Sequence, residues 1–186
     1  MKRLIIVLLL VAPGLLRAQS HRVNFDAGWR FLLGDDSAAF RPDYDDSRWR
    51  VLDLPHDWSI EGRFDSANST GQQEGGLPAG VGWYRKKFSG DYRWVEFDGV
   101  YRNSEVWING HYLGKRPYGY TSFRYEIGPW MKKGGENVIV VRVDNSKQPN
   151  SRWYSGSGIY RHVWVEKDGG FDPWKMIITT EVLSEV

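Results

Sequence analysis

Residues 144–154 bring together, in one short stretch, the side-chain types that bind a sugar. The stretch reads Asp-Asn-Ser-Lys-Gln-Pro-Asn-Ser-Arg-Trp-Tyr. Sugar hydroxyls need planar polar groups in fixed positions, and the face of a sugar ring stacks on an aromatic side chain. Trp153 and Tyr154 could provide that stacking surface, or they could pack against another part of the protein. The residue types therefore indicate carbohydrate recognition by a loop.

Other patterns that could support chemistry have simpler structural explanations. Six acidic residues are candidates for an acid–base pair: Asp57, Glu61, Glu74, Glu105, Glu126 and Asp144. Each of them is explained as a turn acceptor or as part of a solvated strand face. His56-Asp57 could belong to a catalytic relay, but Pro55 before it and Trp58 after it favour a turn. The glycine-rich residues 75–82 lack the lysine and following helix of a phosphate-binding loop, and no histidines have metal-ligand spacing.

The composition is typical of a globular protein and excludes an obvious nucleic-acid partner. The 186 residues are 26% charged and 41% hydrophobic, and the formal net charge is +2. Basic and acidic residues are interspersed, so no basic footprint for nucleic acid is visible. The chain has no cysteine, which excludes disulfides and thiolate zinc sites. Burial alone must stabilise the mature domain, and about 165 residues are enough for that.

The first 18 residues are typical of a secretory signal peptide. Lys2 and Arg3 form a positive start, residues 4–16 are apolar apart from Pro13-Gly14, and cleavage is expected after Ala18. The alternative is a membrane anchor, but an apolar run of about 13 residues is too short to span a bilayer comfortably. We therefore expect a secreted protein, periplasmic if the source is a Gram-negative bacterium, with no membrane association after cleavage.

Short strands separated by turn residues predict an all-β fold. The expected strands span residues 29–33, 49–54, 82–88, 93–97, 104–108, 111–114, 120–127, 137–143 and 159–165. Asn109-Gly110 predicts a hairpin, because both turn positions need positive φ. A tight turn at residues 89–91 predicts a second hairpin, and the apolar run at residues 137–143 predicts burial on both faces. Such strands favour a jelly-roll-like antiparallel β-sandwich.

Four motifs resemble the N-terminal sugar-binding domain of family 2 glycoside hydrolases. They are residues 54–58 (Leu-Pro-His-Asp-Trp), residues 97–100 (Phe-Asp-Gly-Val) with residues 104–114 (Ser-Glu-Val-Trp-Ile-Asn-Gly-His-Tyr-Leu-Gly), residues 137–145, and residues 151–161 (Ser-Arg-Trp-Tyr-Ser-Gly-Ser-Gly-Ile-Tyr-Arg). Together they cover residues 22–166 in the family's order and spacing. The last motif looks most like the β-galactosidase branch.

The resemblance implies a division of the chain into three parts. Residues 1–18 are the signal peptide, residues 19–167 the galactose-binding-domain-like sandwich, and residues 168–186 a linker and the start of a truncated immunoglobulin-like domain. In the family a (β/α)₈ barrel follows and carries both catalytic glutamates. The chain is thus expected to stop before the barrel and to lack catalysis of its own. No cofactor is expected in it, although full-length family members can use Mg²⁺ or Na⁺.

The resemblance also implies which residues contact the sugar. The family has a polar, often acidic, sugar-contacting residue a few positions before residues 157–159, and the match falls on Asn150 or Arg152. Trp153 and Tyr154 complete the predicted site. The implied partners are a β-galactoside-type carbohydrate and the missing immunoglobulin-like and barrel domains. A stand-alone lectin-like module and a structural interaction domain are the alternative functions.

Overall fold

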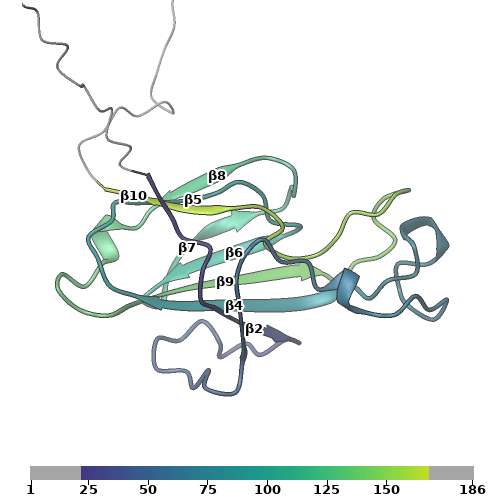
Figure 1. Cartoon of the computed structure of the whole chain (residues 1–186), viewed down its shortest axis with the longest axis horizontal. Coiled ribbons are helices and arrows are strands. Elements are labelled where there is room, and N and C mark those ends of the chain that lie inside the picture. Colours follow the sequence, from purple (N-terminus) through teal and green to yellow (C-terminus); the bar gives the residue numbers. More distant parts are fainter. Residues whose placement is uncertain (1–21, 168–186) are drawn as a thin grey trace, which may run out of the picture.

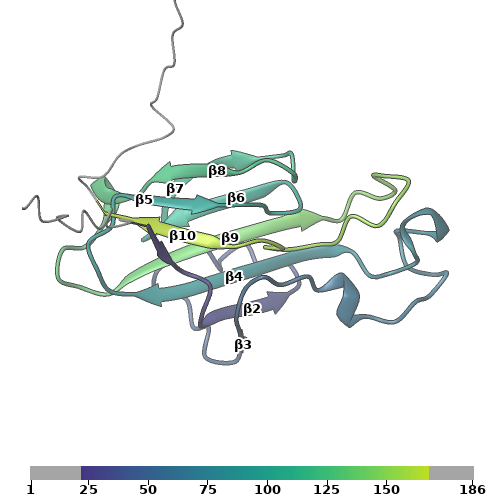
Figure 2. The same cartoon turned by 45° about the horizontal axis from the view of Figure 1, so that its top comes forward.

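The computed structural model describes residues 22–167, which form two antiparallel β-sheets that face each other (Figures 1 and 2). One sheet has four strands in the order β1–β10–β5–β8, and the other has six in the order β3–β2–β4–β9–β6–β7. The strands are β1 (Arg22–Asn24), β2 (Trp29–Leu33), β3 (Arg50–Leu52), β4 (Gly80–Phe88), β5 (Trp94–Phe97), β6 (Ser104–Ile108), β7 (His111–Arg116), β8 (Phe123–Glu126), β9 (Asn137–Asn145) and β10 (Val163–Glu166). The predicted two-sheet β-sandwich is confirmed.

Helix is confined, in residues 22–167, to three short 3₁₀ turns: η1 (Ser59–Glu61), η2 (Gln72–Glu74) and η3 (Gly128–Trp130). None of the helices in this part of the chain is long and apolar enough to cross a membrane. The predicted signal peptide (residues 1–18) and the predicted linker and truncated domain (residues 168–186) lie outside the described residues.

The main hydrophobic core fills the space between the two sheets. Val95 and Phe97 of β5 and Val163 and Val165 of β10 enter it from the four-stranded sheet, and all four are fully buried. Every second residue of the strands in the six-stranded sheet points into the same core, because successive side chains of a strand face opposite sides of the sheet. Burial of this apolar surface, without any disulfide, is the main stabilising contribution to the sandwich.

A second, smaller core lies on the outer face of the six-stranded sheet. Residues 34–49, which join β2 to β3 and are called the covering loop here, pack Ala39 and Trp49 against Trp83, Val138 and Val140. The inner-face residues of β9 belong to the main core, so this strand is buried on both faces as its apolar run predicts.

A buried ion pair fastens the covering loop to β4. The Arg85 guanidinium is fully buried, and its Nε donates to Asp46 Oδ2 at 2.9 Å. Its Nη1 also donates to the backbone carbonyls of Ala39 and Arg41. The covering loop therefore buries an arginine on the outer face of the six-stranded sheet.

One of the two predicted hairpins is confirmed and the other is wrong. Asn109 and Gly110 have φ of 50° and 82° and join β6 to β7, with Ile108 paired to His111. By contrast, residues 89–93 carry the chain from β4 in the six-stranded sheet to β5 in the four-stranded sheet. The strands pair elsewhere: β4 lies between β2 and β9, so no edge of β4 is free for β5.

The strand ends also differ in places from the sequence-based expectation. The short edge strand β1 is not predicted, and the expected strand at residues 159–165 narrows to β10. Before β10, Gly158 makes an isolated bridge to Tyr101. Gly158 has φ of 120°, and an added Cβ would lie 2.3 Å from the Tyr84 hydroxyl oxygen, so this position needs glycine.

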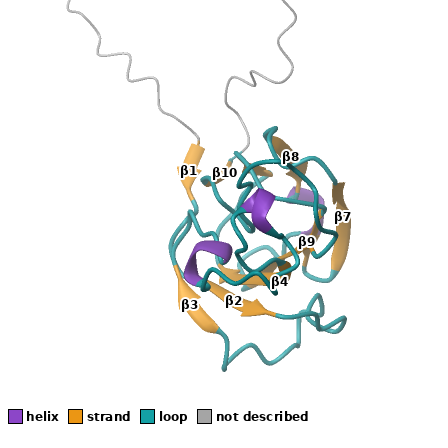
Figure 3. Ribbon diagram, turned by 90° about the vertical axis from the view of Figure 1, so that its right-hand side faces the viewer, coloured by secondary structure: helices purple, strands orange, loops and turns teal. Residues whose placement is uncertain are grey.

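Several loops gather at one end of the sandwich, on the right in Figures 1 and 2 and facing the viewer in Figure 3. There β9 ends and β4 begins, because Gly80 pairs with Asn145. The loops that meet at this end are residues 57–79, 98–103, 117–122 and 146–162 (Figure 1). The predicted sugar-contacting residues lie on the last of these.

Candidate functional site

A cavity of about 510 Å³ opens between the 117–120 and 150–153 segments at this end. We call it the groove. It is lined by Tyr101, Arg102, Pro117, Tyr118, Gly119, Tyr120, Asn150, Ser151 and Trp153. Two of the predicted contact residues, Asn150 and Trp153, therefore share one cavity, and the 117–120 segment supplies its opposite wall.

Aromatic side chains form most of the groove surface. Trp153 and Tyr118 are 61% and 60% exposed, so their ring faces are available to a ligand. The Trp153 Nε1–H donates to the Tyr120 hydroxyl at 3.2 Å, which ties the two walls together. Tyr120 packs against both Tyr118 and Tyr101, with ring centroids 5.6 and 5.3 Å away. Such rings can stack on the apolar face of a sugar.

Sequence reasoning did not find Tyr118 and Tyr120. They lie about thirty residues before the predicted loop, and nothing local connects the two segments. The available signal was a Pro-Tyr-Gly-Tyr run between two strands, since turn residues with two large aromatic rings place those rings at the surface.

Asn150 is the most firmly positioned polar group in the groove. The Tyr101 hydroxyl donates to its Oδ1 at 2.9 Å, and its Nδ2 donates to Asn145 Oδ1 at 2.7 Å. These bonds fix the orientation of the amide. Nδ2 also donates to the Lys147 carbonyl at 3.5 Å, so the site that stays available for a ligand hydroxyl is the second acceptor lone pair of Oδ1.

Glu74 holds the backbone of the same loop in place. Its carboxylate is buried, and Oε1 accepts hydrogen bonds from the backbone N–H groups of Asn150 and Ser151 at 2.7 and 2.9 Å. Oε2 accepts from the Ser155 hydroxyl at 3.3 Å. The sequence-based interpretation of Glu74 as a turn acceptor or solvated residue missed this role, because its partners lie 76 or more positions away.

We expect Glu74→Ala to loosen the 150–155 segment while Glu74→Gln leaves it in place. Alanine removes the acceptor for two partly buried backbone N–H groups, whereas glutamine keeps Oε1. Amide hydrogen exchange at Asn150 and Ser151 should accelerate by about tenfold or more in the alanine variant. Glu136→Ala, which removes an exposed carboxylate paired with Lys87, is the control. Unchanged exchange in Glu74→Ala would contradict the positioning role.

The other two predicted contact residues lie apart from the groove. Tyr154 turns away from Trp153, and its hydroxyl donates to the Asp57 carboxylate. Burial, together with this hydrogen bond and the Asp57 charge, raises the pKa of Tyr154. Arg152 is exposed and is not among the described residues that line the groove. The structure thus brings together Asn150 and Trp153, and separates Arg152 and Tyr154 from them.

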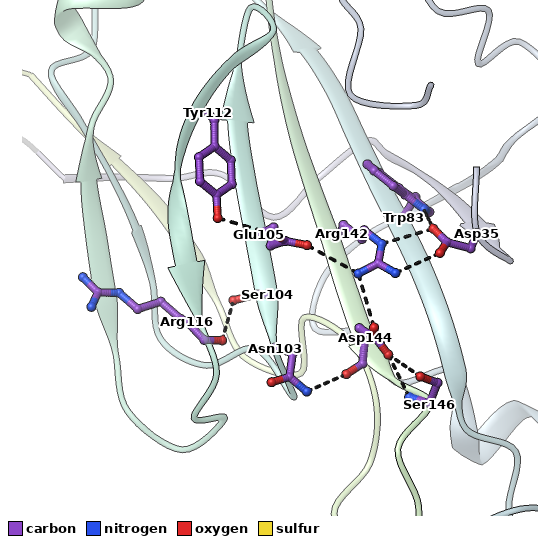
Figure 4. A network of polar contacts seen from close by, with 10 residues as sticks. All are labelled: Asp35, Trp83, Asn103, Ser104, Glu105, Tyr112, Arg116, Arg142, Asp144 and Ser146. Atoms are coloured by element: carbon purple, nitrogen blue, oxygen red, sulfur yellow. Dashed lines mark hydrogen bonds and ion pairs between the residues drawn. The ribbon is translucent and has the colours of Figure 1, made fainter. Parts of the chain in front are cut away.

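A polar network on the outer face of the six-stranded sheet anchors the start of residues 146–162, called the site loop here (Figure 4). Arg142 of β9 forms ion pairs with Asp35, Glu105 and Asp144 at 2.8, 3.4 and 3.3 Å. Its hydrogen bonds lower the pKa of Asp35. Asp144 in turn accepts from the backbone N–H of Ser146 at 3.0 Å, where the loop leaves the strand.

The C-terminal end of β9 also holds residues 101–103, two of which line the groove. The backbone N–H of Asp144 donates to the Arg102 carbonyl, and the Asn103 side chain donates to the Asp144 carbonyl, both at 3.0 Å. Both the 101–103 segment and the site loop are therefore attached to one rigid element, as a preformed binding site requires.

His56 links the segment after β3 to β4 and to residue 159 at the end of the site loop. The Arg50 guanidinium donates to its Nε2 at 2.7 Å, so the neutral ring carries its proton on Nδ1 and donates to the buried Tyr84 hydroxyl. The His56 backbone N–H donates to the Ile159 carbonyl. Burial lowers the pKa of His56 below its usual value of 6.5. The turn predicted at residues 55–58 is not formed, because the backbone N–H groups of His56 and Trp58 donate to the carbonyls of Ile159 and Ser157 and the segment runs beside residues 157–159.

His56 should make the fold sensitive to mild acid. Its pKa is lower in the folded than in the unfolded chain, so the unfolded chain binds the proton more readily. The free energy of unfolding should therefore fall as the pH drops below about 6.5, by at most about 1.4 kcal/mol per pH unit. Urea unfolding between pH 8 and pH 5 measures the slope, which His56→Gln should remove and the control His111→Gln should keep. An unaltered slope in His56→Gln would refute this assignment.

The six candidate carboxylates all have structural partners. Asp57 accepts two backbone N–H bonds, Glu61 pairs with Arg50, and Glu126 pairs with Arg93. Glu74, Glu105 and Asp144 are engaged as described above. No group of three or more potential metal ligands was found in the described part of the chain.

Comparisons with known proteins agree with this architecture. The family model "Glycosyl hydrolases family 2, sugar binding domain" matches residues 24–168. A β-galactosidase of Bacteroides ovatus, BoGH2A, is 55% identical over 173 residues, which is 88% of this chain and 20% of that protein. A β-glucuronidase of Formosa agariphila is 30% identical over 76% of this chain and 16% of its own length.

Superposition on solved structures gives the same family relationship. A β-glycosidase from Bacteroides vulgatus superposes with a TM-score of 0.75 at 51% identity, over 77% of this chain and 20% of that one. This chain thus spans about a fifth of the length of the relatives it matches.

Proposed function

The chain belongs to glycoside hydrolase family 2, as its sugar-binding domain, and we propose that it serves in an exported β-galactosidase-type hydrolase by forming one wall of the substrate subsite. On this proposal its jelly-roll-like sandwich holds the groove next to the catalytic domain of the complete enzyme. The partners are then a β-galactoside and the immunoglobulin-like and barrel domains of the complete enzyme. The signal-peptide pattern of residues 1–18 supports export.

The groove is the observation that carries this proposal. It combines exposed aromatic rings, which suit the face of a pyranose, with a fixed carboxamide, which suits its hydroxyls. Residues 117–120 and 150–153, which form its two walls, lie at one end of the sandwich, where a neighbouring domain can also contact them. Asn150 and Trp153 are the residues we assign to direct sugar contact.

The hydrolysis itself is assigned to residues outside this chain. A retaining glycosidase needs two carboxyl groups about 5 to 5.5 Å apart, one as acid/base and one as nucleophile. The carboxylates of this domain are engaged in ion pairs, turns and loop anchoring. The domain therefore contributes binding and positioning of the sugar, which raises the effective concentration of the scissile bond at the catalytic groups.

The expressed chain tests this proposal directly. With a chromogenic β-galactoside it should show no turnover, and calorimetric titration with methyl β-D-galactopyranoside should show weak, saturable binding, in the millimolar range. Turnover that disappears when a carboxylate of this chain is replaced would overturn the assignment of catalysis. Binding much tighter than millimolar would favour a stand-alone lectin-like module, and absence of binding would favour a structural interaction domain.

A further inference from the structure

The side chain of Arg102, at the edge of the groove, has no ion-pair partner among the residues that the structure describes. Its side chain is partly buried and lines the cavity. Its Nε is buried and makes no hydrogen bond, and among residues 22–167 the guanidinium has no ion pair. By contrast, the fully buried Arg85 pairs with Asp46, and the partly buried Arg142 pairs with three carboxylates.

The charge of the groove is set by this one residue. Its other lining residues are aromatic, amide, hydroxyl, proline or glycine, so Arg102 is the single charged group among them. The buried Nε of Arg102 makes no hydrogen bond, and an oxyanion that enters the cavity would supply an acceptor for it and a counter-charge for the guanidinium. Arginine also binds carboxylate or sulfate groups through two parallel N–H···O bonds, which gives directional recognition.

The backbone around Arg102 is held firmly enough to aim the side chain. Its carbonyl accepts the Asp144 N–H at 3.0 Å, and the neighbouring Asn103 bonds to the Asp144 carbonyl. Tyr101, on the other side, contacts Asn150 and Tyr120. The guanidinium thus starts from a fixed point beside the rings and the carboxamide that would hold a sugar.

We propose that the groove selects a sugar that carries an anionic group, a carboxylate or a sulfate, and that Arg102 is the residue that recognises it. This inference rests on the proposed role of the groove in sugar binding. Trp153 and Tyr120 provide the surface for the sugar ring, Asn150 bonds a hydroxyl, and Arg102 bonds the oxyanion. Arg102 then determines specificity and does not contribute to the affinity for a neutral sugar.

Titration of the expressed chain with three probes tests this inference. The probes are methyl β-D-galactopyranoside, its 6-sulfate, and methyl β-D-galactopyranosiduronic acid, each measured with the wild type, Arg102→Gln and Trp153→Ala. Hydrogen bonds to charged groups should make at least one acidic probe bind the wild type about 10- to 100-fold tighter than the neutral one. Arg102→Gln should remove that difference and leave the neutral probe within about twofold. Whichever acidic probe is preferred identifies the anion.

The outcomes separate failure of this inference from failure of the proposed function. If the neutral probe binds, Trp153→Ala weakens it, and neither acidic probe binds the wild type better, the inference is wrong and the proposed function stands. The inference is also wrong, and the proposed function stands, if Arg102→Gln leaves the preference for an acidic probe unchanged. That result is expected if the guanidinium pairs with a carboxylate of another domain. If no probe binds, or Trp153→Ala has no effect on any of them, the proposed function is wrong and the inference falls with it.

Discussion

Replacing Trp153 with alanine is expected to weaken binding of methyl β-D-galactopyranoside by about tenfold, which corresponds to about 1.4 kcal/mol. The substitution removes the most exposed ring of the groove and its hydrogen bond to Tyr120, which joins the two walls. The folded domain should stay stable, because the side chain is 61% exposed. Isothermal titration calorimetry measures the affinity, and circular dichroism checks the fold.

Trp130 provides the matched control for this substitution. It is also an exposed tryptophan, at 45%, and it stacks on His111, but it belongs to η3 at the opposite end of the sandwich (Figure 1). Trp130→Ala should leave the sugar affinity unchanged. Equal losses in the two variants would mean that the effect does not come from the groove.

A larger effect, on stability, is expected for Asp46→Ala. The substitution removes the carboxylate that pairs with the fully buried Arg85 guanidinium. An uncompensated buried charge typically costs about 3–5 kcal/mol, so the free energy of unfolding should fall by that amount. The covering loop should loosen first, because the Asp46 carboxylate is the group through which the loop pairs with Arg85 of β4. Urea unfolding followed by tryptophan fluorescence gives the value.

Asp43→Ala is the control for the buried pair. Asp43 lies in the same covering loop and pairs with Arg41, but both side chains are largely exposed. Exposed pairs contribute about 0–1 kcal/mol, so this variant should unfold almost like the wild type. If the two variants lost the same free energy of unfolding, the buried Arg85–Asp46 pair would not be the main attachment of the covering loop.

The sandwich could be predicted from sequence because its signals are local. Alternating strands, the Asn109-Gly110 turn and the apolar run of β9 each depend on neighbouring residues. The covering loop could not be predicted in the same way. Its contacts with β4 join positions that are 39 or more residues apart, and a buried Arg85 in a strand has no local signature.

The candidate site was only partly predictable for the same reason. Asn150 and Trp153 follow from the family motif, but the adjacent Tyr154 turns to Asp57, since neighbouring side chains of an irregular loop can face opposite ways. Tyr118, Tyr120 and Arg102 reach the groove only after β-strand pairing brings the ends of several loops to one side.

The most direct test of the central claim, that the groove receives the sugar, is an NMR titration of the ¹⁵N-labelled chain with methyl β-D-galactopyranoside. The Trp153 indole signal can be assigned by its absence in Trp153→Ala. We expect the largest shifts at that indole, at the Asn150 side-chain amide and at the backbone of Tyr118 and Tyr120. Shifts concentrated at the opposite end, around Tyr92 and Lys133, or no shifts at saturating sugar, would contradict it.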